Sequence, residues 1–519
     1  MKRVLVWIMV LIFSCAMGAF SSLKVHKAHA ATINVHLGES IQAAVAGAND
    51  NDIILVDPGA YTEVAPITPT KNNLTIQGSG ASVTTISTNN NVFYIGSAVQ
   101  NLTIKGFTLT TIIPSIGIFC DRGGQQGTAT GTISDNIITN NPGANNTFGI
   151  SLIGGCSFEI KNNTVTQGVD LGIFVNEITA TNNIHDNQIT HNTVGVFLAA
   201  AAANPNNTLV HHNTISDNQY GIFVTNSTAS IYNNSINNNI GGLSGGGIAT
   251  MASTLQIYAN KIFQNSAGAG GGIAIIISNA GSNIYNNYIS QNSAITTVGG
   301  GILSVEDATP IFNNTIVNNT ATVGGMGPNS FQPLNFKIQG YPDLEQKING
   351  ELKTLSDQFH IDAGEHIGGG AYFTSDVAVS PLFYNNIVWG NTDGVVSAVL
   401  DTPILTYNDM QDNFILVPAS VKDSVITGNI ALDPRLSGYT LQEDSPCIDM
   451  GASAGAPSND IDGTGRPQRN GIDMGAYELA ALTPTETITT ASTLPDTGAA
   501  SLQSLLLRMI TFQLLSLLL

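Results

Sequence analysis

The sequence predicts an all-β protein: a right-handed parallel β-helix solenoid with an N-terminal capping helix and a short helical insertion. One observation is an asparagine that recurs, over its first eight copies, at intervals of 21 to 27 residues. Another is that short β-branched runs broken by Asn or Gly, typical of strands and turns, accompany each copy. A period in the mid-twenties holds about three short strands, so consecutive periods are expected to stack as parallel coils. The recurring residues are Asn136, Asn163, Asn187, Asn213, Asn234, Asn260, Asn287, Asn314 and Asn386.

Apolar residues stand at two fixed distances from each asparagine, and these positions predict the core. Three positions before it are Ile133, Ile160, Ile184, Val210, Ile231, Ile257, Ile284, Ile311 and Phe383. Two positions after it are Ile138, Val165, Ile189, Ile215, Ile236, Ile262, Ile289, Ile316 and Val388. A disordered Asn-rich tract is the alternative, and the regular isoleucine spacing argues against it.

Asparagine suits the corners of such coils for two reasons. It tolerates the left-handed backbone that a corner needs. Its amide carries both a donor and an acceptor, so stacked copies are expected to hydrogen-bond along the solenoid axis. The repeat is therefore structural first, and function is expected where the sequence departs from it.

Residues 1–30 have a basic start, an apolar run and small residues at Ala28 and Ala30, a pattern typical of a secretory signal peptide. An internal membrane anchor is the weaker alternative. Loss of the four basic residues in this stretch changes the net charge from −19 to −23, since it contains no acidic residue. That charge disfavours nucleic acid as a partner and repels polyanionic sugars unless a cation bridges them. We expect a monomer.

Three cysteines remain after the leader, Cys120, Cys156 and Cys447. Such a sparse and odd set indicates a fold that does not depend on disulfides. The sequence leaves open whether Cys120 and Cys156 pair.

The start of the predicted solenoid, which spans 31–480, carries the stretch "ESIQAAVAGANDNDIILVDPGAYTE". With "NLTIQGSG" and "NLTIKGFTL" further on, residues 34–110 resemble the first coils of pectin-lyase-like β-helix proteins. The resemblance implies a short amphipathic helix that covers the open end of the core. The resemblance does not indicate a particular reaction or ligand, because this fold hosts lyases, hydrolases, epimerases, adhesins and binding proteins.

Residues 445–478, "SPCIDMGASAGAPSNDIDGTGRPQRNGIDMGAYE", resemble the conserved tail of bacterial surface β-helix proteins. Asp462 and Arg466 match the Asp and Arg of that motif, which implies an ion-paired plug over the final coil. Asp460 and Asp462 also alternate before a glycine as in a calcium loop, although the usual downstream Glu is missing. Calcium is the one cofactor that the sequence suggests.

A Thr/Pro-rich linker, 481–493, leads to "LPDTG" and an apolar tail, 494–519. This arrangement resembles the sortase sorting signal of Gram-positive bacteria and implies sortase as a partner, cleavage between Thr497 and Gly498, and a cell-wall location. Arg508 interrupts the apolar run and no basic cluster follows it, so membrane retention or a vestigial tail are the alternatives.

One outward column, two positions before the asparagines, changes character along the chain. Its first part is basic or ionisable, with Lys161, His185 and His211, and Asp135, Asp186 and Asp217 lie near it in sequence. A proton-transfer or metal site is one interpretation, and a solvated polar face is the other. The later part is aromatic and predicts either a sugar platform or plain stabilising stacking, with Tyr232, Tyr258, Tyr285, Phe312 and Tyr384.

An excess of about 45 residues over the repeat period predicts an insertion, 322–367, between Asn314 and Asn386. Leu344, Ile348 and Leu352 recur in it at helical spacing, which predicts a helix lying on the solenoid. The insertion is expected either to build a binding face or to be a surface embellishment.

These features favour a secreted, surface-attached protein that binds or processes polysaccharide. If it is an enzyme, a lyase or epimerase is expected, with Lys161 or a histidine taking the proton alpha to a uronate carboxylate while an aspartate-held cation neutralises it. No intact catalytic motif of these enzymes is present. The alternative is therefore a non-catalytic structural or adhesive stalk that binds a protein partner.

Overall fold

The computed structural model describes residues 30–111, 115–122, 126–140, 148–166, 170–176, 181–200, 207–242, 244–322, 346, 368–375, 380–399, 403–411, 415–416 and 425–481. The predicted signal peptide, linker and sorting signal lie almost entirely outside these ranges, as does the predicted helical insertion. Within them, no helix is both long enough and apolar enough to cross a membrane. The described residues up to Leu479 belong to one compact unit.

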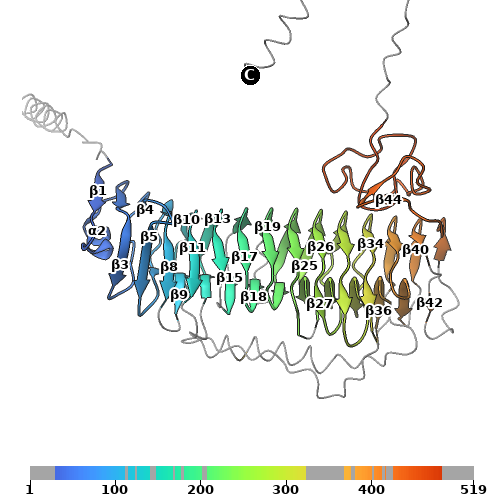
Figure 1. Cartoon of the computed structure of the whole chain (residues 1–519), viewed down its shortest axis with the longest axis horizontal. Helices are drawn as coiled ribbons and strands as arrows, with labels where there is room; N and C mark the ends of the chain where they lie inside the picture. The colour runs from blue at the N-terminus through green and yellow to red at the C-terminus, as the bar shows by residue number, and fades with distance from the viewer. Residues whose placement is uncertain are drawn as a thin grey trace, which may run out of the picture. The chain divides into compact units, whose positions relative to one another are not determined.

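Coil upon coil, the chain winds into a parallel β-solenoid, as the repeat predicts (Figure 1). Three long sheets, which we call A, B and C, form its wall. Within the described ranges they contain 15, 13 and 12 strands, and each strand pairs in parallel with its counterparts on the neighbouring coils. The right-handed sense of the winding stays a prediction.

Sheet A contains β1 (Thr32–Val35), β2 (Ile53–Val56), β4 (Thr75–Gly78), β7 (Leu102–Lys105), β10 (Ala129–Ser134), β13 (Cys156–Lys161), β16 (Asn183–His185), β19 (Asn207–His211), β22 (Thr228–Tyr232), β25 (Thr254–Tyr258), β29 (Asn283–Tyr285), β33 (Ile311–Phe312), β37 (Leu382–Tyr384), β40 (Ile404–Thr406) and β43 (Val425–Thr427). Sheet B contains β3 (Gly59–Glu63), β5 (Thr84–Thr88), β8 (Thr108–Thr111), β11 (Ile137–Asn140), β14 (Thr164–Thr166), β17 (Gln188–Thr190), β20 (Thr214–Ser216), β23 (Ser235–Asn237), β26 (Lys261–Phe263), β30 (Tyr288–Ser290), β34 (Thr315–Val317), β38 (Ile387–Trp389) and β41 (Asp409–Met410).

Sheet C contains β6 (Phe93–Ile95), β9 (Ile116–Asp121), β12 (Phe148–Ile153), β15 (Leu171–Asn176), β18 (Val194–Ala199), β21 (Tyr220–Thr225), β24 (Ile248–Met251), β28 (Ile273–Ile276), β32 (Ile302–Val305), β36 (Ala371–Thr374), β39 (Val395–Ala398) and β42 (Ile415–Leu416). A small parallel sheet joins β27 (Ser266–Ala267), β31 (Ser293–Ala294) and β35 (Thr320–Ala321). Near the C-terminus, β44 (Leu436–Ser437) and β45 (Thr440–Leu441) form an antiparallel pair.

Both predicted apolar columns line the core. Every residue of the column three before the recurring asparagine, and every residue of the column two after it, is at most 2% exposed. The columns hold register from coil to coil, as when Ile231 pairs with Ile257 and Ile257 with Ile284. Stacking aligned isoleucines in this way buries the apolar side of each short strand, which no coil could do alone.

The recurring asparagines form the predicted hydrogen-bonded ladder. Asn260 Nδ2, for example, donates to Asn287 Oδ1 at 3.0 Å, while Asn260 Oδ1 accepts the side-chain amide of Asn234 at 3.0 Å. The ladder runs from Asn136 through all nine predicted positions and continues to Asn408 and Asn429. A second ladder, five residues further on in each coil, joins Asn192, Asn218, Asn239, Asn265, Asn292, Asn319 and Asn391.

The left-handed backbone of the corner falls one residue earlier than the sequence suggested. The ladder asparagines do not adopt it; the residue before each one does, with φ of 57° at Asp135, 54° at His212 and 53° at Asn286. Several residue types occupy that preceding position, among them Asp, His, Ala and Asn. The ladder position requires the amide, and this is why asparagine is repeated there.

Helix α2 (Ile41–Gly47) lies at the N-terminal end of the solenoid (Figure 1). Ser40 caps it by accepting a hydrogen bond from the Ala43 amide, and Ile41 and Val45 are buried in the same cluster as the solenoid core. The predicted helix is therefore present, and its role as a cap stays a prediction. Cys120 and Cys156, whose pairing the sequence left open, form a disulfide between β9 and β13.

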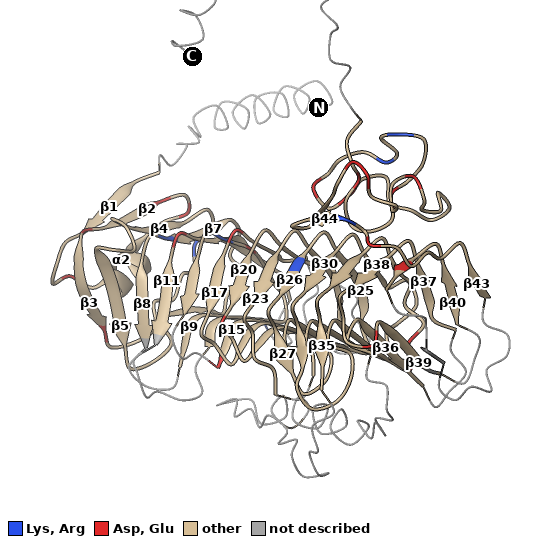
Figure 2. Ribbon diagram, turned by 45° about the vertical axis from the view of Figure 1, so that its right-hand side comes forward, with Lys and Arg blue, Asp and Glu red and all other residues tan. Residues whose placement is uncertain are grey.

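Residues 445–479 follow the last strands of the solenoid, and we call them the C-terminal segment. They fold back along the side of the solenoid, above β30 to β38 (Figure 2). The Asn286 side chain donates to Asn459 O at 2.6 Å, and the Ala476 amide donates to Thr315 Oγ1 at 3.0 Å. Apolar contacts join them, since Cys447 and Met474 cluster with Val317 and Ile387 of the solenoid. The predicted role of this segment as a plug over the final coil stays a prediction.

Candidate functional site

The outward column of sheet A forms one continuous stack of seven rings. Neighbouring rings lie nearly parallel, with interplanar angles of 3° to 18° and centroids 4.7 to 5.1 Å apart. The parallel register of sheet A sets this spacing, because it places equivalent side chains directly above one another. We call this stack the ring ladder; it contains His185, His211, Tyr232, Tyr258, Tyr285, Phe312 and Tyr384.

Mutual stacking changes what the ring ladder can offer a ligand. The faces of Tyr258 lie against Tyr232 on one side and Tyr285 on the other, at 4.9 and 5.0 Å. The faces expected to carry a pyranose ring are thus occupied, and ring edges and phenol hydroxyls are left for contact. Burial raises the pKa of Tyr258 to about 12, so its hydroxyl stays a hydrogen-bond donor across the physiological range.

A cleft of about 800 Å³ lies between the ring ladder and the C-terminal segment. Tyr258, Tyr285 and Phe312 form its floor, and residues 455–463 form its other wall, with Gly455, Asn459 and Asp462 among them. At one end the lining reaches His212 and Asn233, where the ring ladder continues beyond the cleft. The cleft therefore covers the middle of the ladder and leaves the histidine end outside.

Buried polar contacts stabilise the fold of the C-terminal segment itself. The Arg466 guanidinium donates to Glu478 Oε2 at 2.9 Å, and the two side chains are 0% and 1% exposed. The same guanidinium donates to the carbonyls of Asp473 and Gly475. This is the ion pair that the tail motif implied for Arg466, but its partner is Glu478, not Asp462.

Asp460 and Asp462 differ in their surroundings. The Asp460 carboxylate accepts three backbone N–H groups, from Asp462, Thr464 and Glu478, at 2.7 to 3.0 Å. Asp462 is exposed and lines the cleft. Asp460 thus shapes its own loop, and in the part of the chain that the structure describes no three His, Cys, Asp or Glu side chains converge on a common point. Calcium at this loop stays a prediction.

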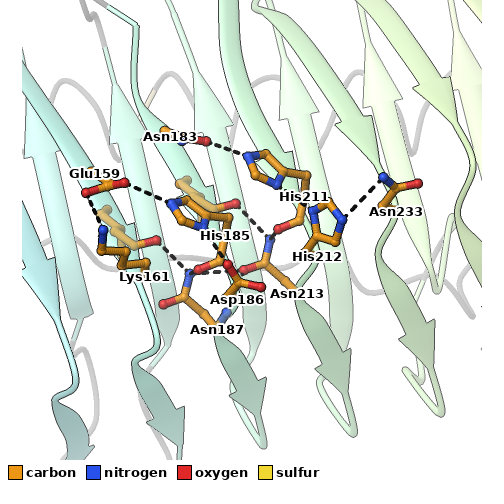
Figure 3. A network of polar contacts seen from close by, with 12 residues as sticks. Glu159, Lys161, Asn183, His185, Asp186, Asn187, His211, His212, Asn213 and Asn233 are labelled. Atoms are coloured by element: carbon orange, nitrogen blue, oxygen red, sulfur yellow. Dashed lines mark hydrogen bonds and ion pairs between the residues drawn. The ribbon is translucent and has the colours of Figure 1, made fainter. Parts of the chain in front are cut away.

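Outside the cleft, the basic end of the column is held by ion pairs (Figure 3). Lys161 Nζ lies 2.8 Å from Glu159, and His185 lies 3.2 Å from Glu159 and 2.6 Å from Asp186. The hydrogen bond from Lys161, followed by that from His185, lowers the pKa of Glu159. An ammonium and an imidazole that both face carboxylates are poorly placed to accept a proton from a substrate.

His211 is also fully engaged. Its Nε2 lies 2.8 Å from Asn183 Oδ1, and its Nδ1 lies 2.8 Å from His212 Nδ1 (Figure 3). Burial, and then the neighbouring histidines, lower the pKa of His211 to about 4, so it remains neutral near pH 7. Asn183 and Asn233 complete the network around the two histidines.

The structure brings together only part of the predicted ionisable site. Lys161, His185 and His211 stack on consecutive strands as expected. Asp217, however, is at the corner after β20, across sheet B from the ring ladder, and Asp135 is two coils away from Asp186. The Asp135 carboxylate accepts a hydrogen bond from Ser134, its neighbour in sequence. The three aspartates do not meet around one cation.

Sequence reasoning missed Glu159, the residue that joins Lys161 to His185. The signal was present, because residues two apart on a strand share a face and Glu159 stands two before Lys161. It also missed that residues 455–463 form a wall of the cleft. No local pattern could show this, since Asn286 and Asn459 are 173 residues apart.

Comparison with known proteins gives one family match. Residues 48–247 match the family described as "Periplasmic copper-binding protein (NosD)". No protein of curated function matches the sequence. The match covers less than half of the chain and includes the whole histidine end of the ring ladder.

The described residues do not fit a copper centre. Copper is held by several imidazole or sulfur ligands around one point, and no three candidate ligands in the described ranges converge in this way. His211 and His212 approach each other, but both ring nitrogens of His185 already face carboxylates. No step is therefore assigned to copper.

Several solved structures are similar to the chain. The A-module of the Azotobacter vinelandii mannuronan C-5 epimerase AlgE6 is 15% identical, over 76% of this chain and 94% of that one, with a TM-score of 0.38. The PL6 family alginate lyase AlyGC is 14% identical, over 75% and 53%, with a TM-score of 0.43. XylC in complex with xylose is 11% identical, over 86% and 98%, with a TM-score of 0.40. Likeness at this level transfers no substrate and no residue role.

Proposed function

We propose that this chain is an exported surface protein that binds carbohydrate in the cleft between the ring ladder and the C-terminal segment. The observation that supports it is the cleft itself, about 800 Å³, with Tyr258, Tyr285 and Phe312 as its floor. Concave sites that combine aromatic side chains with a few placed polar groups are the usual form of a ligand site. Tyrosine offers an apolar edge and a polar tip, both of which suit a sugar.

Binding is favoured over lyase or epimerase chemistry by the contacts of the ionisable residues. Lys161 and His185 face carboxylates, and both ring nitrogens of His211 have partners. A general base needs a free acceptor within hydrogen-bond reach of the substrate. A catalytic role for these three residues stays a prediction and is not needed for the proposed function.

The test is a glycan-binding measurement on the mature chain and on Tyr258→Phe and Tyr285→Phe. Each change keeps the stacked ring and removes only the hydroxyl. We expect each to weaken binding about three- to tenfold, the value of one hydrogen bond. Tyr372→Phe, in sheet C and away from the cleft, is the matched control and should bind normally.

The measurement should be run with calcium and with a chelator, because the calcium loop at Asp460 and Asp462 is still a prediction. Equal binding by all three variants and the wild type would show that the hydroxyls of the floor are not used. Absence of binding to any glycan would favour the alternative, a structural or adhesive stalk that binds protein.

We also propose export and attachment through residues 494–498. The signal-peptide pattern supports export, and the match to a periplasmic family is consistent with a place outside the cytoplasm. If a sortase processes the tail, mass spectrometry of the surface-bound protein should show Thr497 as its last residue. Recovery of chains that still carry Leu519 and that detergent alone extracts would show membrane retention.

A further inference from the structure

The walls of the cleft are mostly neutral. Amides and hydroxyls supply most of their polar groups, from Asn233, Ser235, Tyr258, Tyr285, Asn286 and Asn459. Such groups both donate and accept hydrogen bonds, as sugar hydroxyls do. They provide no fixed positive charge for a carboxylate or sulfate.

The few charged groups of the cleft do not favour an anion. Asp460 is buried with its carboxylate bonded to backbone amides, and Asp462 is exposed. The one lysine of the lining, Lys261, has its ammonium 4.5 Å from the centre of the Tyr439 ring. The lining thus contains two carboxylates and one lysine, and the ammonium of that lysine already contacts an aromatic face. The whole chain, at −19, adds to the repulsion of a polyanion.

One end of the cleft is closed. The Tyr384 hydroxyl donates to Gly455 O at 3.1 Å, which ties the next ring of the ladder to the C-terminal segment. Beside it, Asn385 and Ala452 exchange two hydrogen bonds of 2.8 Å. At the opposite end the lining runs out to His212 and Asn233. A linear ligand that enters past His212 along the floor therefore meets a barrier at Tyr384.

We infer that the cleft binds the end of an uncharged glycan chain. The inference rests on the proposed function and specifies its ligand. The neutral walls select against uronate and sulfated chains, and the contact at Tyr384 and Gly455 stops a chain from passing through. The remainder of the glycan leaves the cleft along the open part of the ring ladder, past Tyr232 and His211.

The test compares oligosaccharides of equal length on the mature chain. Neutral hexose and N-acetylhexosamine oligomers are measured beside oligogalacturonate and oligomannuronate, at low and at high salt. A neutral oligomer should bind at least about tenfold more tightly than either uronate, and its affinity should not change with salt, because screening acts only on charge. Tighter binding of a uronate would overturn the inference while leaving carbohydrate binding intact.

The position of the chain end is tested with bulky fluorescent tags on one end or the other. A tag on the inserted end should abolish binding, and a tag on the other end should have little effect. Tyr384→Phe removes the hydroxyl that closes the cleft and should reduce this difference. Tyr372→Phe, in β36 and outside the lining of the cleft, should leave both results unchanged. Equal binding of both tagged forms by the wild type would overturn the chain-end assignment. Failure of every glycan to bind would overturn the proposed function itself.

Discussion

Asn260→Ala is expected to lower the free energy of unfolding of the solenoid by about 3–5 kcal/mol, because each buried polar group left without its partner costs about 1–3 kcal/mol. The Asn260 side chain donates to Ile231 O, Tyr258 O and Asn287 Oδ1, and it accepts from both the backbone and the side-chain amide of Asn234. Alanine removes all of these contacts in a position that is 0% exposed.

Urea unfolding, followed by circular dichroism and by hydrogen exchange, measures the effect. Exchange should rise first in the coils on either side of Asn260, since each coil of a solenoid contacts only its neighbours. Asn237→Ala is the matched control: Asn237 is a partly exposed strand residue whose side chain bonds only to its neighbours Ser235 and Asn238. It should cost less than about 1 kcal/mol. Equal losses in the two variants would contradict a structural role for the ladder.

Arg466→Met is expected to destabilise the folded C-terminal segment by about 3–5 kcal/mol, because it leaves the Glu478 carboxylate buried without its partner. The Glu478 side chain is 1% exposed, and it accepts hydrogen bonds from the amides of Gln468 and Asp473 as well as from Arg466. Those amides do not replace a full positive charge. The segment should open while the coils below it remain folded.

Proteolysis and hydrogen exchange of residues 445–479 report this opening, and loss of the cleft should abolish glycan binding at the same time. Arg435→Met removes a different ion pair, the exposed one with Asp444, and should change stability by less than about 1 kcal/mol. Arg466→Met with Glu478→Gln should recover part of the loss, since no unpaired charge then remains. Unchanged protease resistance in Arg466→Met would contradict the role of the pair.

Much of the solenoid was predictable from the sequence because its contacts repeat with the sequence. A residue such as Ile257 meets its equivalents Ile231 and Ile284 one coil away, so periodicity alone defines the core. Two ladder residues, Asn408 and Asn429, escaped notice because Met410 and Ala431 stand two positions after them, where the earlier coils have isoleucine or valine. The position of the C-terminal segment was not predictable. It depends on contacts between the repeat and a segment outside the repeat, for which no period exists.

The candidate site was predictable only as a list of residues. The sequence placed His211 and Tyr232 in one column, but it could not show that adjacent rings cover each other's faces at 4.7 Å. It placed Lys161 on the surface, but the pairing with Glu159 depends on side-chain conformation. Strand geometry determines which residues share a face of the sheet. Side-chain packing determines which of their atoms remain free to bind a ligand.

The asparagine ladder also determines how this architecture can change in evolution. Asn213 and Asn234 bond across 21 residues of chain, and Asn314 and Asn386 bond across 72, with the same geometry near 3.0 Å. Each coil therefore fixes only a short stretch around its asparagines and leaves the length of the connecting loops free. Loops can be inserted, lengthened or exchanged between coils without altering the core beneath them. Whole coils can be duplicated for the same reason, so such a protein can acquire new binding surfaces by recombination of its loops alone.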